Sequence, residues 1–284
     1  MTRIDRRALF ASGAAAALLS AAGVSLDAAP VPGGRLRLAV PRADGLMEAV
    51  ARASVFDTLT EIAPDGVLRG ELATGWRASP DARVWLFDLR RDAVFHDGTR
   101  LTAGDVAASL RAHDAPELAG VLSAEATAPA QLRLELAEGN PHLPYLLSDP
   151  RLIVGPAGEV AAPFEAWIGT GRYRLERARA GRHFLGQRVD PHYKDGRAGW
   201  ADSVEIIVIP DAGVRAEALR DGYVDVAALP LAEGLAGGGF LCHPSPENIA
   251  LAARRDVGMP RRIGARAALD DGRIAERWWK RADG

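Results

Sequence analysis

The stretch of residues 72–106 constrains the fold more than any other part of the chain, because it encodes consecutive elements with different periods. Trp85, Phe87 and Leu89 are spaced two apart, which places them on one face of a half-buried strand. Residues 96–99, His-Asp-Gly-Thr, combine residue types that accept the backbone of a tight reversal. A turn accounts for the histidine and the aspartate, so we favour it over a metal or catalytic pair.

A capped helix is predicted directly after this turn. Thr102 precedes the Ala-rich segment 103–110, and Asp105 stands at the third helical position. There its carboxylate can complete a capping box and complement the helix dipole. A second helix is predicted over residues 210–221, with Asp211 as its cap and with Val214, Ala218 and Leu219 on one side.

Strands and short helices alternate along the rest of the chain. Strands are predicted at residues 35–40, 132–136, 173–176, 206–209 and 223–227, a buried turn-and-strand segment at 54–62, and a short proline-containing helix at 140–147. The pattern predicts an α/β fold of the mixed α+β kind.

The N-terminus has the layout of an export signal. Arginines precede an apolar run over residues 8–24, which ends in small residues. We therefore predict a signal peptide over residues 1–28. The pair Arg6-Arg7 resembles a twin-arginine signal, although Asp5 departs from that pattern and leaves the general secretory route open. The mature protein is expected to be soluble in the periplasm.

Composition excludes several classes of function. The chain holds 35 Lys and Arg against 37 Asp and Glu, a formal net charge of −2, which gives no basic surface for nucleic acid. Cys242 is the single cysteine, so no internal disulfide can form. With His243 it supplies two adjacent potential ligands, fewer than a zinc or copper centre requires. No nucleophile motif is recognisable, and we predict neither an enzyme nor a bound cofactor or metal.

Two blocks of sequence resemble the family-5 extracellular solute-binding proteins, which are receptors of ABC importers for peptides, nickel and oligosaccharides. The first block comprises Leu72-Ala73, Trp76, Trp85-x-Phe87-x-Leu89-Arg90, Val94 to Thr99, Leu101 to Ala103 and Asp105-Val106. The second comprises Gly169-Thr170-Gly171, Tyr173, Leu175, Asp190 to Tyr193, Ile206 to Asp211, Leu219, Gly222 and Val224-Asp225. Arg172 stands where the family usually has proline, and Val189 where it usually has asparagine.

The resemblance implies the architecture and role of the chain. Residues 29–245 correspond to the N-terminal lobe of a periplasmic binding protein of type II-like architecture. Residues 246–284 correspond to a remnant of the crossover and the first helix of the second lobe, which is otherwise largely absent; residues 248–253 look like the crossover strand. The implied function is the periplasmic solute-binding component of an ABC importer for peptides or a similar small solute, with a permease as partner. The alternative is a single-lobe periplasmic interaction or scaffold protein, working as a homodimer or with a separate second lobe.

The resemblance also implies where a ligand would be held. In the family the cleft floor includes the loop after the first strand, here Pro41 to Gly45, and the segment that corresponds to residues 167–171. Arg42 and Asp44 would pair with a charged ligand and Trp167 would stack on it, beside Gly169 and Thr170. Exposed loop charges, a core tryptophan and a purely structural tight turn are the alternative interpretations.

Overall fold

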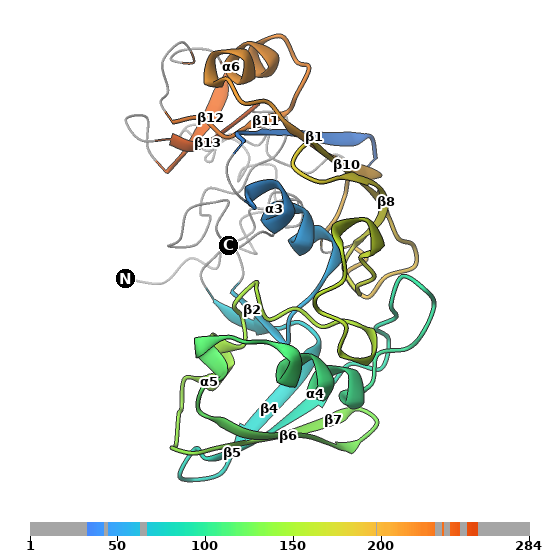
Figure 1. The fold of residues 1–284 in the computed structure, drawn as a ribbon, viewed down its shortest axis with the longest axis vertical. Coiled ribbons are helices and arrows are strands. Elements are labelled where there is room, and N and C mark those ends of the chain that lie inside the picture. Colours follow the sequence, from blue (N-terminus) through green and yellow to red (C-terminus); the bar gives the residue numbers. More distant parts are fainter. Residues whose placement is uncertain are drawn as a thin grey trace, which may run out of the picture.

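The computed structural model describes residues 33–42, 45–62, 67–196, 198–230, 235, 239–244 and 249–254. Within these ranges no helix combines the length and apolar character that crossing a membrane requires. The predicted signal peptide and the helix predicted near the C-terminus lie outside the described residues. Figure 1 shows two units, one built on a seven-stranded sheet and the other on a four-stranded sheet, with helix α3 (Leu46–Val55) between them.

The larger sheet combines strands from both ends of the described chain. Its order is β12 (Phe240–Pro244), β13 (Ile249–Arg254), β11 (Val226–Ala227), β1 (Arg35–Val40), β10 (Ser203–Val208), β9 (His183–Arg188) and β8 (Tyr173–Arg179). The first strand β1 pairs in parallel with β10 and β11, and the other pairs are antiparallel. The strands predicted near residues 35, 173, 206 and 249 are thereby confirmed.

Both faces of the larger sheet are covered, and the alternation of β1 assigns its side chains to the two layers. Leu36 and Leu38 pack in the core that α3 covers, whereas Ala39 packs with residues of helix α6 (Ala212–Arg220). The α6 helix begins at Asp211, whose side chain accepts a hydrogen bond from the backbone N–H of Val214, so the predicted cap is confirmed.

The predicted buried side of α6 was wrong at one position. Val214 is 49% exposed, and the helix instead buries Arg215 together with Leu219. The guanidinium of Arg215 donates to the backbone oxygens of Ala228 (2.7 Å) and Pro210 (2.9 Å). A buried charge is tolerated where hydrogen bonds replace its hydration, and these bonds fasten α6 to the ends of β10 and β11.

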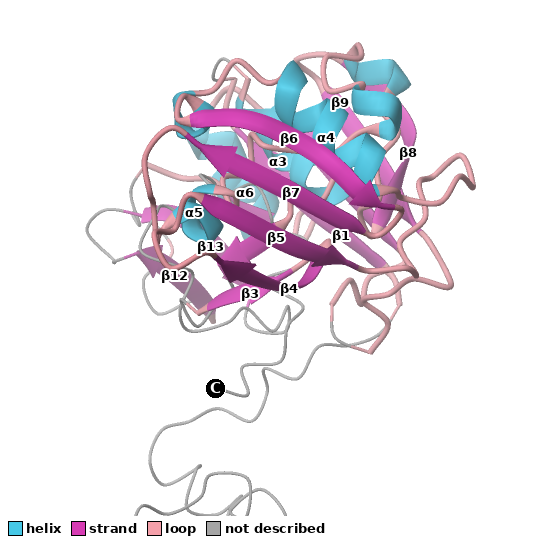
Figure 2. Cartoon of the chain, turned by 90° about the horizontal axis from the view of Figure 1, so that it is seen from below, coloured by secondary structure: helices cyan, strands magenta, loops and turns pink. Residues whose placement is uncertain are grey.

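The smaller sheet runs in the order β4 (Ala73–Ala78), β5 (Val84–Leu89), β7 (Gln131–Leu136) and β6 (Val121–Ala128), all antiparallel. Trp85, Phe87 and Leu89 are buried on the face that helix α4 (Ala103–Ala112) covers, as predicted. Figure 2 shows the opposite face, which no helix covers. Thr102 and Asp105 form the predicted capping box at the start of α4.

Short elements complete the two units. They are the hairpin of β2 (Thr60–Ile62) and β3 (Leu68–Gly70), helix α5 (Leu143–Leu146), and the 3-10 turns η2 (Pro116–Leu118), η3 (Pro156–Gly158) and η4 (Phe164–Ala166). The short proline-containing helix predicted over 140–147 is confirmed by α5, which has Pro144 in its first turn.

Candidate functional site

Three charged side chains form a buried ion cluster where the two units meet. Asp57 lies between α3 and β2, Glu71 between β3 and β4, and Lys194 after β9. The Nζ atom of Lys194 lies 2.7 Å from Asp57 Oδ1 and 2.7 Å from Glu71 Oε1. All three side chains are nearly withdrawn from solvent. One ammonium group therefore links the larger unit to both segments that lead into the smaller one.

The other carboxylate oxygens of the ion cluster accept hydrogen bonds from threonines. Thr170 Oγ1 donates to Asp57 Oδ2 over 2.8 Å, and the backbone N–H of Thr58 donates to Glu71 Oε2 over 2.9 Å. Buried carboxylates are stable when charge partners and hydrogen bonds replace water. The arrangement is thus a structural tie, and it fixes the position of Thr170.

His96 joins the turn of residues 96–99, here called the signature turn, to the Gly-Thr-Gly turn of residues 169–171 before β8. Its Nε2 donates to the backbone oxygen of Gly171 over 2.8 Å, and its backbone N–H donates to Gly169 O over 2.9 Å. A Cβ atom on Gly169 would lie 2.0 Å from Val55 O, so close backbone packing requires glycine there. Burial is the main cause that lowers the pKa of His96, which favours its neutral form.

The buried histidine predicts a pH dependence of stability. Because the pKa of His96 is lower in the folded protein than its value of about 6.5 in unfolded chains, the unfolded state binds more protons below that pH. This contribution is complete above about pH 6.5 and is lost as pH falls, by at most about 1.4 kcal/mol per pH unit. Urea unfolding at pH 7.5 and 5.5 should show a smaller difference for His96→Gln than for the parent. The exposed His142→Gln variant is the control, and an equal change in both variants would contradict the assignment.

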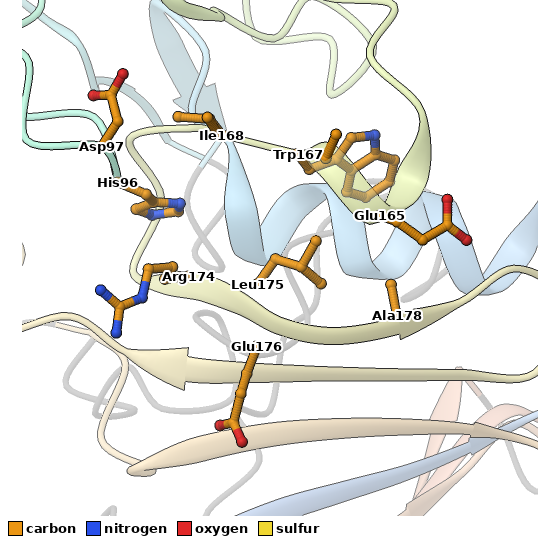
Figure 3. Close-up of a pocket in the computed structure, with 10 residues that line it drawn as sticks. His96, Asp97, Glu165, Trp167, Ile168, Arg174, Leu175, Glu176 and Ala178 are labelled. Carbon is orange, nitrogen blue, oxygen red and sulfur yellow. The ribbon is translucent and has the colours of Figure 1, made fainter.

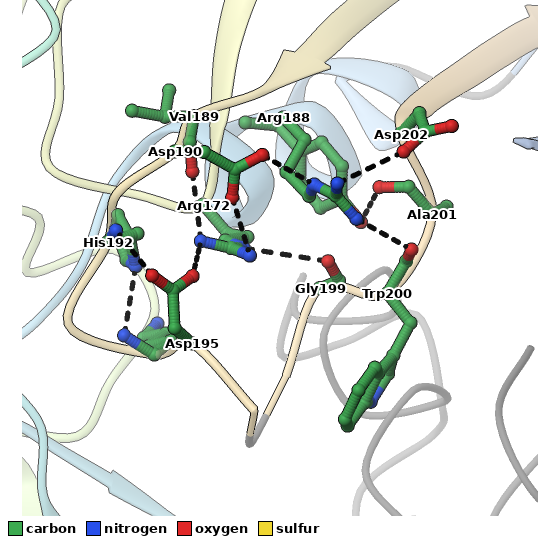
Figure 4. A network of polar contacts seen from close by, with 12 residues as sticks. Arg172, Arg188, Val189, Asp190, His192, Asp195, Gly199, Trp200, Ala201 and Asp202 are labelled. Carbon is green, nitrogen blue, oxygen red and sulfur yellow. Dashed lines mark hydrogen bonds and ion pairs between the residues drawn. The ribbon is translucent and has the colours of Figure 1, made fainter. Parts of the chain in front are cut away.

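Arg172 stands where the family usually has proline, and its contacts position the loop that carries Lys194. Figure 4 shows these contacts. Its guanidinium is 5% exposed and lies 2.6 Å from Asp195 Oδ1 and 3.2 Å from Asp190 Oδ1. It also donates to Val189 O over 2.9 Å. The two positions that depart from the family pattern, 172 and 189, are therefore in direct contact, and the arginine supplies ties that proline cannot make.

A pocket of about 410 Å³ opens between the signature turn, the η4 segment and β8 (Figure 3). It is lined by His96, Asp97, Glu165, Ala166, Trp167, Ile168, Arg174, Leu175, Glu176 and Ala178. The ion cluster and the His96 contacts hold its two walls together. Its lining combines charges of both signs with apolar side chains, which suits a small polar solute better than a purely apolar one.

Of the four predicted ligand residues that the structure describes, only Trp167 lines the pocket. Trp167 lines the pocket, but it is 6% exposed and packs edge-on against Phe164. Gly169 and Thr170 are buried in the contacts of the Gly-Thr-Gly turn. Arg42 is exposed after β1, and Asp44 lies outside the described residues. Their role in ligand binding stays a prediction.

Residues that sequence reasoning did not select make up most of the pocket. Glu165, Ile168 and Arg174 stand on a loop and a strand end without a motif of their own. His96 was interpreted as a turn residue, and the turn is confirmed by the bond from Thr99 N to Asp97 Oδ1. Its contact with Gly171, 75 residues away, has no signal in the local pattern.

The comparisons with known proteins agree with the fold. The model of the bacterial extracellular solute-binding proteins, family 5 Middle, matches residues 67–237, more than half of the 284 residues. The chain belongs to this family. The predicted mixed α/β fold of a periplasmic binding protein lobe and the resemblance that implied it are confirmed. Among the described residues, no group of His, Cys, Asp or Glu side chains is arranged to hold a metal ion.

Two curated relatives of this family-5 chain are named as binding proteins. The probable D,D-dipeptide-binding periplasmic protein DdpA of Escherichia coli (strain K12) is 28% identical over 180 residues, 58% of this chain and 34% of the relative. The nickel-binding periplasmic protein of the same organism is 28% identical over 192 residues, 62% of this chain and 36% of the relative. The chain thus spans about a third of the length of these relatives.

A solved structure extends the likeness to three dimensions. The periplasmic binding protein AgaA from A. tumefaciens R10, solved in complex with agropinic acid, superposes with a TM-score of 0.64 at 27% sequence identity. The match covers 70% of this family-5 chain and 45% of AgaA. The match therefore supports the lobe architecture described above.

Proposed function

We propose that this chain captures a small solute in the periplasm and presents it to an ABC importer. The observation that supports this best is the pocket between the two units, whose walls come from both and are fixed by buried polar contacts. A partly apolar hollow with a few charged groups is the usual form of a small-molecule site. Membership of the family-5 solute-binding proteins supports the same role.

Peptides or similarly sized polar solutes are the proposed ligand class. Names of relatives refer to a D,D-dipeptide and to nickel, and the solved neighbour holds agropinic acid. The dipeptide and agropinic acid are small molecules with several polar groups, and nickel is a small cation. The proposal takes the same general class for this chain, with an ABC permease as the partner that receives the solute.

Native mass spectrometry of protein isolated from the periplasm tests solute capture. We expect one small solute per chain, and titration calorimetry with that solute should give a Kd no tighter than about micromolar, near −8 kcal/mol. Ile168→Arg, which fills the pocket, should weaken binding, whereas Leu122→Arg on the exposed surface of β6 should not. Retention of a protein partner in place of any solute would favour the interaction or scaffold role.

Importer coupling needs its own experiment. Deleting the gene should reduce cellular uptake of the solute identified by mass spectrometry, and a plasmid copy should restore it. The Ile168→Arg variant should restore uptake less well than Leu122→Arg, because only the first substitution places a side chain in the pocket. Normal uptake in the deletion strain would contradict the importer role while leaving solute capture standing.

Export through the twin-arginine route is proposed from Arg6 and Arg7. Replacing both by lysine should leave the precursor in the cytoplasm, because the paired guanidinium groups distinguish this signal from an ordinary secretory one. Cell fractionation and immunoblotting measure the outcome, and Arg3→Lys is the matched control. Unchanged periplasmic recovery of the double variant would rule this route out.

A further inference from the structure

We propose that the pocket along β8 selects solutes that carry an acidic group at one end and a basic group at the other, separated by an apolar body. This inference rests on the proposed function of solute capture, and it assigns the recognition of each end to a particular residue. Arg174 would bind the acidic group and Glu165 the basic group. The assignment follows from the order of charges and apolar side chains along one wall.

Arg174 provides the cationic end of the pocket. Among the described residues its guanidinium has no hydrogen-bond or ion-pair partner, and it lies beside His96 in the lining (Figure 3). His96 does not compete for an anion, because its Nε2 proton is already donated to Gly171 O. Among the described residues no ion pair joins Asp97 to Arg174, and the Oδ1 atom of Asp97 accepts from the backbone and hydroxyl of Thr99. A carboxylate of a ligand is therefore the anion that Arg174 can pair with.

Glu165 provides the anionic end. It is exposed on the η4 turn, next to Trp167 and Ala178, and among the described residues its carboxylate has no hydrogen-bond or ion-pair partner. Figure 3 shows the carboxylate of Glu176 pointing away from this wall, on the other side of β8. An ammonium or guanidinium group of a ligand is the cation that Glu165 can pair with at this end.

The surface between the two charges is apolar. Ile168, Leu175 and Ala178 line it, together with the small exposed part of Trp167. Arg174 and Ala178 lie four positions apart on β8, but the strand bulges between Leu175 and Arg177. The residues opposite them on β9, Gln187 and Phe184, are therefore only three positions apart, which corresponds to about 10 Å at 3.3 Å per residue. A chain of several methylene groups has a similar length. The apolar body of a ligand would displace water from this surface, while its two charged ends pair with Arg174 and Glu165.

Titration calorimetry with three probes of equal length tests the assignment: 6-aminohexanoate, hexanoate and hexylamine. We expect 6-aminohexanoate to bind at least about tenfold more tightly than either probe with one charge. Arg174→Gln should weaken 6-aminohexanoate about tenfold and leave hexylamine unchanged. Glu165→Gln should weaken 6-aminohexanoate and hexylamine about tenfold and leave hexanoate unchanged. Arg177→Gln on the same strand and Glu125→Gln on β6, neither of which lines the pocket, are the matched controls.

Several outcomes would overturn the inference. One is binding of 6-aminohexanoate that is no tighter than that of hexanoate; another is an equal effect of Arg174→Gln and Arg177→Gln. Failure of this inference is distinguishable from failure of solute capture. If the periplasmic protein retains a solute and neither pocket variant alters its retention, solute capture is supported. The assignment of the two ligand ends to Arg174 and Glu165 is then wrong. If neither a solute nor any probe binds, both fail.

Discussion

Replacing Lys194 by methionine is expected to lower the free energy of unfolding by about 3–5 kcal/mol, the usual cost of removing one partner from a buried ion pair. The methionine keeps most of the side-chain length but leaves Asp57 and Glu71 without the ammonium group that both now contact at 2.7 Å. Two buried carboxylates would then repel each other. Urea unfolding monitored by tryptophan fluorescence measures the change.

An exposed ion pair supplies the matched control. Arg77 NH1 lies 2.9 Å from Asp88 Oδ2, with both side chains about half exposed, so Arg77→Met should cost less than about 1 kcal/mol. Adding Asp57→Asn and Glu71→Gln should recover part of the stability. Equal shifts in the urea midpoint for Lys194→Met and Arg77→Met would contradict a buried, coupled cluster.

Replacing Phe87 by alanine is expected to cost about 3–5 kcal/mol, because the lost transfer energy adds to that of the cavity left behind. The ring is fully buried and lies beside Trp85, with ring centroids 6.1 Å apart, and beside Trp76 at 6.2 Å. The central position of β5 between β4 and β7 leaves little room for the core to collapse onto the cavity.

Leu122→Ala is the control in the same sheet. Leu122 is 67% exposed on β6, so its truncation should change stability by less than about 0.5 kcal/mol. Denaturant unfolding compares the variants through the midpoint, with the slope expected to stay the same. A Phe87→Ala protein that unfolds at the parent's midpoint and slope would mean that the strand is not part of the core.

Helix α3 is an element that was missed because its start carries no capping signal. Met47, Val50, Ala51 and Val55 are buried at helical spacing, and that period was the available signal. The helix begins at Gly45, in the left-handed conformation, with no side-chain cap. Its start therefore lacks the Ser, Thr, Asp or Asn that marks a helix N-terminus. Residues 54–62 were instead interpreted as a turn and a strand. That prediction is wrong for residues 54 and 55, which belong to α3.

The sequence by itself determined the elements whose signals act over a few residues. The period of two in Trp85, Phe87 and Leu89 specifies a strand because neighbouring side chains must share one face. Thr102 with Asp105, and Asp211 before α6, specify helix starts because each satisfies backbone N–H groups within one turn. The order of such signals was also sufficient to indicate the family.

The tertiary structure alone decided which distant side chains meet. Lys194 contacts Asp57 and Glu71 across 137 and 123 positions of sequence, and no local pattern encodes a pairing of that separation. The pocket is decided in the same way, since Arg174 and Glu165 become two ends of one site only when β8 packs beside η4. Local periodicity reports which face of an element is apolar. The partner of each buried charge depends instead on how the packed elements bring remote segments within hydrogen-bonding distance.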